Sequence, residues 1–115
     1  MLAASEALRI GQRFGLEVGM LLDIGEGLNA VGPLVGRILR GQVLTRQFDS
    51  GLALGQLLKG IESASSVAQA CGVEAPLLAV CRDSWVAAET RLGSGADHSA
   101  LIRWLETVVP PAPRT

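Results

Sequence analysis

The chain has few of the residues that mark metal sites, disulfide frameworks or nucleic-acid contacts. Its 115 residues include two cysteines, one histidine, no tyrosine, two phenylalanines and two tryptophans. Ten basic and eleven acidic residues leave a formal charge of -1, so there is no excess of positive charge to hold a phosphate backbone. We therefore expect neither a nucleic-acid partner nor a metal site.

Long hydrophobic runs and targeting signals are also missing. No uninterrupted apolar run approaches the roughly 20 residues that a helix needs to cross a bilayer. The first residues, Met-Leu-Ala-Ala-Ser-Glu, carry neither a basic leader nor a signal-peptide core. These absences predict a cytoplasmic protein without a membrane contact.

What the chain does contain is a composition rich in aliphatic residues and alanine, which is typical of packed helices. Hydrophobic residues make up 49% of the sequence, and its length suits one domain. We expect a single all-α domain over residues 1–109, followed by a flexible proline-rich tail over 110–115. The apolar fraction is high for so short a chain, so we also expect hydrophobic surface to be buried against another chain, as in a homodimer, or against another domain.

The longest helical pattern lies in residues 48–72, where apolar residues recur at intervals of three and four. The apolar positions in this segment are Leu54, Leu57, Leu58, Ile61, Ala64, Ala68 and Cys71. This spacing predicts a long central helix with one buried face and with Lys59 on another side.

Shorter helices are expected around the central one, giving a bundle of about six helices. The pattern predicts helices over 3–14 and 16–24, a third that opens at Asn29 or at Gly32-Pro33 and ends at 40–41, and a loop over 42–50. A helix from Pro76 to Leu92 is expected to present a core face, and a last helix is expected to run from an Asp97 cap to Val108. The predicted core face of the fifth helix consists of Leu77, Cys81, Trp85, Ala88 and Leu92.

Four segments in this order resemble motifs of one enzyme family. They are Ser5-Glu-Ala-Leu-Arg-Ile-Gly-Gln-Arg-Phe-Gly-Leu, Gly25-Glu-Gly-Leu-Asn29, Phe48-Asp-Ser-Gly-Leu-Ala-Leu-Gly-Gln-Leu-Leu-Lys-Gly60 and Gly93-Ser-Gly-Ala-Asp-His-Ser-Ala-Leu-Ile-Arg-Trp-Leu-Glu106. Together they cover residues 5–106 and resemble the C-terminal all-α domain of the β-hydroxyacid dehydrogenases. That family includes 3-hydroxyisobutyrate dehydrogenase and is related to 6-phosphogluconate dehydrogenase.

The resemblance implies a part of an oxidoreductase. In the family this domain closes the substrate cleft and forms much of the dimer interface. A separate nucleotide-binding domain with a Gly-x-Gly-x-x-Gly turn holds NAD or NADP, and an interdomain helix carries the catalytic lysine. Neither feature occurs in these 115 residues. We therefore expect no catalytic residue and no bound cofactor in this chain alone, and the uncapped start of the first helix suggests a fragment of a longer protein. The full-length enzyme would transfer hydride between a nicotinamide and a small β-hydroxyacid.

Two departures from the family pattern leave a second interpretation open. Gly60 replaces the acidic residue that follows the motif lysine, and Leu52 replaces an aromatic residue before the long helix. A stand-alone, non-catalytic helical module for dimerisation or partner binding would tolerate both changes. The alternatives are thus a cleft domain of a dehydrogenase and a module derived from that domain.

Two residues are candidates for a cofactor-binding or substrate cleft. Lys59 falls on the motif lysine, and its ammonium group supplies a point charge with three hydrogen-bond donors. The alternative is an exposed lysine that pairs loosely with Glu62 or Ser63 one turn further on. Asn29 could place an amide in the same cleft, but asparagine at the start of a helix is more often a cap.

The remaining distinctive residues favour structural roles. His98 is expected to face solvent or to accompany the Asp97 cap, and Cys71 and Cys81 are expected to be buried free thiols, since neither spacing nor neighbours suit a metal. Gly55 and Gly60, inside the predicted long helix, indicate a close approach by another helix or a ligand. Trp85 and Trp104 are expected to anchor a core or an interface.

Overall fold

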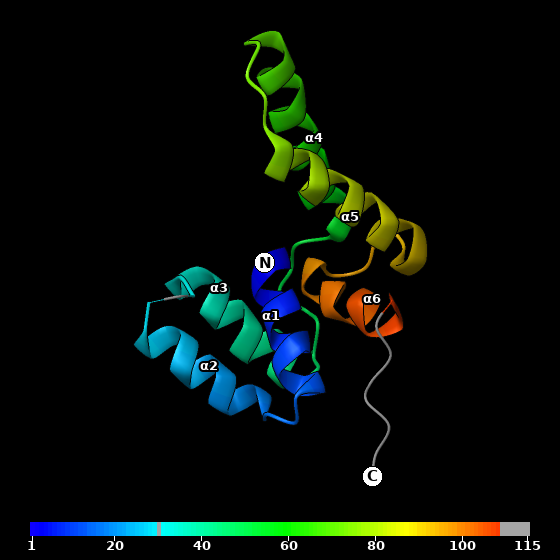
Figure 1. The fold of residues 1–115 in the computed structure, drawn as a ribbon. Coiled ribbons are helices and arrows are strands. Elements are labelled where there is room, and N and C mark those ends of the chain that lie inside the picture. Colours follow the sequence, from blue (N-terminus) through cyan, green and yellow to red (C-terminus); the bar gives the residue numbers. More distant parts are fainter. Residues whose placement is uncertain (30, 109–115) are drawn as a thin grey trace. The chain divides into compact units, whose positions relative to one another are not determined.

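The computed structural model describes residues 1–29 and 31–108, and the expected tail lies outside these residues. The described chain forms six α-helices and two short helical turns of other types, without a strand (Figure 1). The elements are α1 (Leu2–Arg13), α2 (Val18–Gly27), α3 (Pro33–Ile38), η1 (Leu39–Leu44), α4 (Leu54–Ala70), α5 (Pro76–Leu92), η2 (His98–Ala100) and α6 (Leu101–Val108). The predicted all-α class is confirmed. None of the described helices is long and apolar enough to span a membrane.

Glycine and proline set several helix boundaries where the sequence predicted them. Gly15, Gly72 and Gly93 follow α1, α4 and α5 with φ angles of 94°, 68° and 93°, a backbone region that side chains with a Cβ disfavour. Pro33 and Pro76 are the first residues of α3 and α5, where the missing N–H has no helical partner to lose. The local chemistry of these residues therefore ends and begins the helices.

The third helix does not stop at residues 40–41 as predicted. A π-helical segment, η1, continues it from Leu39 to Leu44, so the predicted loop over 42–50 is wrong in its first part. Leu39 is fully buried and Val43 is 5% exposed. The burial of these two side chains stabilises the extra turn, which sequence periodicity alone did not show.

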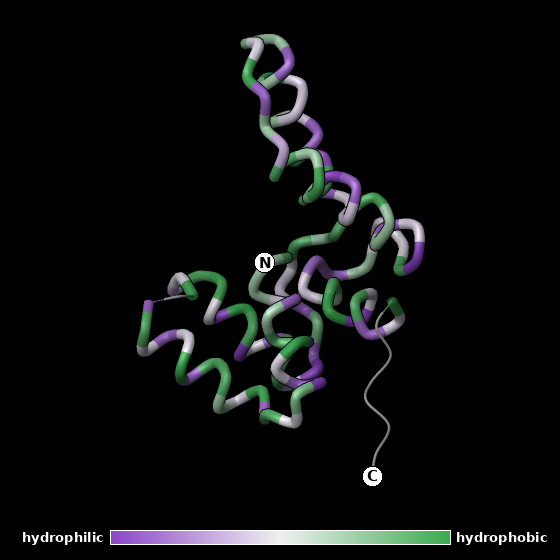
Figure 2. The backbone as a smooth tube through the Cα atoms, in the orientation of Figure 1, coloured by the Kyte–Doolittle hydropathy of each residue, from purple (hydrophilic) through white to green (hydrophobic). Residues whose placement is uncertain are grey.

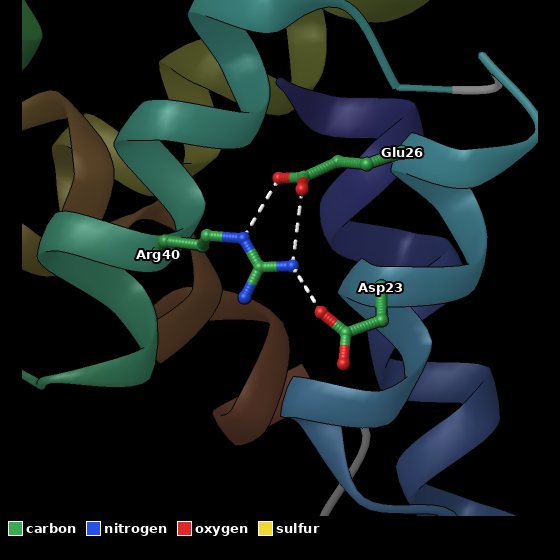
Figure 3. Close-up of polar contacts among 3 residues, drawn as sticks. All are labelled: Asp23, Glu26 and Arg40. Carbon is green, nitrogen blue, oxygen red and sulfur yellow. Dashed lines mark hydrogen bonds and ion pairs between the residues drawn. The ribbon is translucent and has the colours of Figure 1, made fainter.

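An arginine on η1 is held by two carboxylates of α2 (Figure 3). Arg40 donates from Nε to Glu26 Oε1 at 2.8 Å, and from Nη2 to Glu26 Oε2 at 3.0 Å and Asp23 Oδ1 at 2.6 Å. These hydrogen bonds, first to Glu26 and then to Asp23, raise the pKa of Arg40 above its ordinary value. A Cβ on Gly36 would lie 2.8 Å from Glu26 Oε1, so the glycine leaves room for the carboxylate. The two carboxylates thus balance the positive charge of the guanidinium, and these bonds orient η1 against α2.

The chain divides into two compact units. The first comprises the described residues of 1–50 together with 99–108. Its core contains apolar residues from α1, α2, η1 and α6, namely Leu8, Leu22, Leu39, Val43 and Ile102. Apolar and polar stretches alternate along α1, α2 and α3 (Figure 2), as expected for helices that bury one face. The helices at the two ends of the described chain thereby pack in one core.

The second unit, residues 51–98, is built on the helical hairpin of α4 and α5. Leu54, Leu58, Trp85 and Ala88 are buried. The predicted core face of α5 is wrong at Leu77, which is 82% exposed, although it shares the helical spacing of the buried positions. Two helices cover each other on one side only, so the hairpin is best buried where residues 93–98 fold back onto it.

Candidate functional site

Lys59 lies on the exposed surface of α4 and is the only lysine of the chain. In the described residues its ammonium group forms no ion pair with Glu62 or with any other carboxylate. Its charge therefore faces solvent.

A surface hollow of about 510 Å³ adjoins this lysine within the second unit. Its walls come from α4, from Glu89 of α5 and from the loop after α5, and comprise Gly55, Gln56, Leu58, Lys59, Glu62, Glu89, Ser94 and Gly95. Glu89, Ser94 and Gly95 were not among the predicted site residues. The signal for the last two was the Gly-Ser-Gly run at 93–95, which opens one of the four family-like motifs.

The two glycines of α4 have different surroundings. A Cβ at Gly55 would lie 2.8 Å from Ser94 Cβ and 3.1 Å from the Ser94 carbonyl oxygen. A close approach is therefore found at Gly55, but its nearest atoms belong to the loop after α5 and not to the predicted helix or ligand. A Cβ at Gly60 would meet no heavy atom of the described chain within 4 Å. No helix of the described residues therefore approaches Gly60 closely, and the approach of a ligand there stays a prediction.

The first backbone N–H groups of α4 already have acceptors. Leu54 N–H donates to the Ala96 carbonyl at 2.7 Å and Gly55 N–H to the Ser94 carbonyl at 3.0 Å. Ala53 N–H donates to the side chain of Gln56 at 3.2 Å. A helix N-terminus binds phosphate through such N–H groups when they are free. This end of α4 is therefore a packed junction and not a phosphate site.

Asp97 and His98 fasten the loop that leads into α4. Asp97 Oδ1 accepts a hydrogen bond from Gly51 N–H at 3.1 Å, and His98 N–H donates to the Leu52 carbonyl at 2.9 Å. Asp97 stands directly before η2, where a cap was predicted. His98 is only 5% exposed, so it does not face solvent, but its Nδ1 lies 3.7 Å from Asp97 Oδ2, in agreement with the alternative prediction that it accompanies Asp97. The hydrogen bond from the His98 N–H to the Leu52 carbonyl holds the residue in this buried position. The described residues contain no group of three metal-ligand side chains.

Asn29, the second candidate, belongs to the first unit and does not cap a helix. It follows α2 with a φ of 56°, and its N–H donates to the Glu26 carbonyl at 3.1 Å. The N-cap of α3 is Gly32, because the fixed φ of Pro33 begins the helix there. The predicted cap is therefore wrong, and Asn29 instead supplies the left-handed turn that ends α2. A cleft that Asn29 shares with Lys59 stays a prediction.

The cysteines and tryptophans have unequal surroundings. Both thiols are free, but Cys71 is exposed and Cys81 is half-buried, so the prediction of two buried thiols is wrong. Cys71 follows α4 at the turn of the hairpin. Trp85 is 3% exposed and anchors the second unit, as predicted. Trp104 is half-buried on α6.

The comparisons with known proteins bear directly on these motifs. No curated protein matches the chain. A family model described as NAD-binding of NADP-dependent 3-hydroxyisobutyrate dehydrogenase matches residues 1–105, nearly the whole chain. This match confirms the resemblance to β-hydroxyacid dehydrogenases that the four sequence motifs indicated. The chain belongs to the NAD-binding family of NADP-dependent 3-hydroxyisobutyrate dehydrogenase.

Proposed function

We propose that this chain is the substrate-cleft and dimerisation domain of an NAD(P)-dependent oxidoreductase that acts on a small β-hydroxyacid. Lys59 is the residue that faces the reactants. One observation carries the proposal: Lys59 is the only lysine of the chain, it lies in a segment that resembles a motif of the family, and it is exposed without an ion pair to any described residue.

The chemistry of Lys59 suits an acidic substrate or the amide of a nicotinamide. Its ammonium group offers a positive charge and three donors, and either partner supplies oxygen acceptors. Glu62 and Glu89 line the same hollow and keep the surroundings of the charge polar. The junction at the start of α4, fixed by Ala96, Ser94 and the Asp97 carboxylate, holds the helix that carries the lysine. The role of Lys59 in this proposal is to bind and orient.

The rest of a dinucleotide has no matching site in the second unit. The N–H groups at the start of α4 are occupied, so they do not offer the donors that a pyrophosphate requires. NAD or NADP supplies hydride transfer when bound, and its phosphates are held by another domain. Calorimetry with residues 1–115 alone is accordingly expected to detect binding of neither cofactor.

The test uses this chain joined to a nucleotide-binding domain, as in the family, with 3-hydroxyisobutyrate and other small β-hydroxyacids as substrates. Lys59→Ala is expected to lower kcat/KM on the order of 100-fold, as when one charged donor at a reacting group is removed. Lys59→Arg retains charge but not shape and should recover part of this loss. Arg82→Ala removes an exposed cation of α5 and serves as the matched control. Equal kinetics for Lys59→Ala and Arg82→Ala would contradict the proposed role.

The bare surface at Gly60 favours a second candidate, a non-catalytic module for dimerisation or partner binding. In the oxidoreductase, Gly60→Asp restores the motif acid beside Lys59 and should alter KM, since a new carboxylate adjoins the substrate. If the chain is instead the non-catalytic module, no variant is expected to transfer hydride with either NAD or NADP. The same assay series therefore separates the two functions.

A further inference from the structure

An apolar groove of about 700 Å³ runs between α1 and α6 in the first unit. It is lined by Glu6, Arg9, Ile10, Arg13, Phe14, Trp104, Leu105 and Val108. Ile10 is 71% exposed, Phe14 is 85% exposed and Val108 is 59% exposed. Contiguous apolar surface of this kind marks an interaction site, because leaving it in water is unfavourable. The sequence showed it only as apolar residues out of phase with the core positions of α1.

Glu6 and Arg13 of α1 flank the exposed Ile10, while the third charged residue of the groove, Arg9, is only 8% exposed. Glu6, Ile10 and Arg13 are spaced by four and three residues, so they lie on one face of the helix. Glu6 and Arg13 are seven residues apart, which corresponds to about 10.5 Å along the axis. An acid and a base thus bracket an apolar centre, and Phe14 extends that centre beyond the last turn.

Such a face is complementary to itself when it is reversed. We propose that the α1–α6 face binds a second copy of this chain, with the two α1 helices antiparallel about a two-fold axis between Arg9 and Ile10. This inference rests on the homodimer proposed above and assigns its surface and register. Glu6 then lies opposite Arg13 of the second copy, and the symmetry repeats the pair. Ile10 and Phe14 of both copies fill the apolar grooves.

The opposite charges of Glu6 and Arg13 select this occupant over a segment that carries charge of one sign. A uniformly acidic segment would meet Glu6, and a uniformly basic one would meet Arg13, so each would carry a like-charge contact. A helix with a base and an acid in the reverse order satisfies both positions. The second copy supplies that order with the same spacing of seven residues.

The experiment is a charge reversal with rescue, read by sedimentation velocity over a range of concentrations of the full chain. Glu6→Arg places two pairs of like charges in the interface, and so does Arg13→Glu. Each single variant is expected to raise the dimer Kd on the order of 10- to 100-fold. The double variant Glu6→Arg/Arg13→Glu recreates both pairs with exchanged signs and should restore the Kd of the original chain. The two single variants, mixed, should form a heterodimer in which every pair is attractive.

Arg37→Glu changes the charge of an exposed residue on α3 and is the control for net charge. Far-ultraviolet circular dichroism of each variant separates lost association from lost folding. A strictly monomeric chain at high concentration overturns the inference, and so does a dimer whose Kd neither single variant changes. Failure of the double variant and of the mixture to associate, with helicity intact, overturns the antiparallel register. Lys59→Ala should leave the Kd unchanged, so the outcome for this surface is distinct from that for the oxidoreductase activity.

Discussion

Gly55 and Gly60 allow the same substitution to be compared at two positions of one helix, five residues apart. Gly60 lies in the interior of α4, exposed, and a Cβ there would contact nothing within 4 Å. Gly60→Ala should therefore stabilise the chain by about 1 kcal/mol, because alanine restricts the unfolded backbone and favours the helix. The expected stabilisation at Gly60 depends on helix propensity alone.

Gly55→Ala should have the opposite sign. The added Cβ would lie 2.8 Å from Ser94 Cβ, 3.1 Å from the Ser94 carbonyl oxygen and 3.3 Å from Glu89 Oε2. The same carbonyl accepts the Gly55 N–H at 3.0 Å, so the loop cannot move away without weakening that bond. Overpacking of this kind costs about 1–3 kcal/mol. The propensity gain offsets little of it, because Gly55 lies in the first turn of α4. We expect a net loss of about 1–2 kcal/mol, and thus a difference of about 2–3 kcal/mol between the two variants.

Urea unfolding followed by circular dichroism at 222 nm, at one fixed protein concentration, measures both changes. In a Ser94→Gly background the nearest contact is removed, so the cost of Gly55→Ala should fall, and the double-mutant cycle isolates that contact. The reasoning would be refuted if both alanine variants were equally stabilised. It would also be refuted if the cost at Gly55 were the same with and without the Ser94 side chain.

Two further predictions concern the first unit. The Leu22 side chain is 1% exposed and lies in the core with Leu8 and Leu39. Leu22→Ala leaves a cavity there and should lower the free energy of unfolding by about 2–5 kcal/mol. Leu28→Ala, at a 74% exposed position just after the same helix, should change it by less than about 0.5 kcal/mol, and equal losses would contradict the assigned core. Glu106→Gln removes the ion pair between Glu106 and Arg46, whose nearest atoms are 2.5 Å apart. Because the Arg46 side chain is 52% exposed, the change should lower the free energy of unfolding by at most about 0.5 kcal/mol in dilute buffer. In about 1 M salt it should have no measurable effect. The hydrogen bond to Glu106 raises the pKa of Arg46 above its ordinary value, so the contribution of the pair to stability is complete below the unfolded pKa of Arg46 and is lost only above the folded one. The difference between the two proteins, measured by urea unfolding, should therefore stay constant from about pH 7 to 10, and a slope in that window would contradict the assignment.

The candidate site was partly readable from the sequence. The motif around Lys59 placed the lysine on a helix, because the apolar spacing of three and four is a local property of the chain. The partners that line its hollow were not readable. Glu89, Ser94 and Gly95 come from thirty or more positions along the chain from Lys59, and only the packing of α5 and its following loop on α4 brings them there. Both Asn29 and the Gly32-Pro33 step are signals for the start of a helix, and the sequence does not reveal which of them is used. In the structure the helix begins at Pro33, so the predicted cap at Asn29 is wrong.

The sequence by itself determined the all-α class, the family and most helix ends, because these depend on side-chain spacing and on the backbone preferences of glycine and proline. Gly15, Gly72, Gly93, Pro33 and Pro76 act on the residues beside them, whatever lies further away. Burial was decided only by the tertiary structure. Leu77 and Trp85 share one helical stripe, yet one is 82% exposed and the other 3%, so helical spacing alone does not decide which of them is covered. The exposure of Ile10 and the burial of His98 could not be read from the sequence for the same reason, since exposure depends on which distant segments pack over a residue.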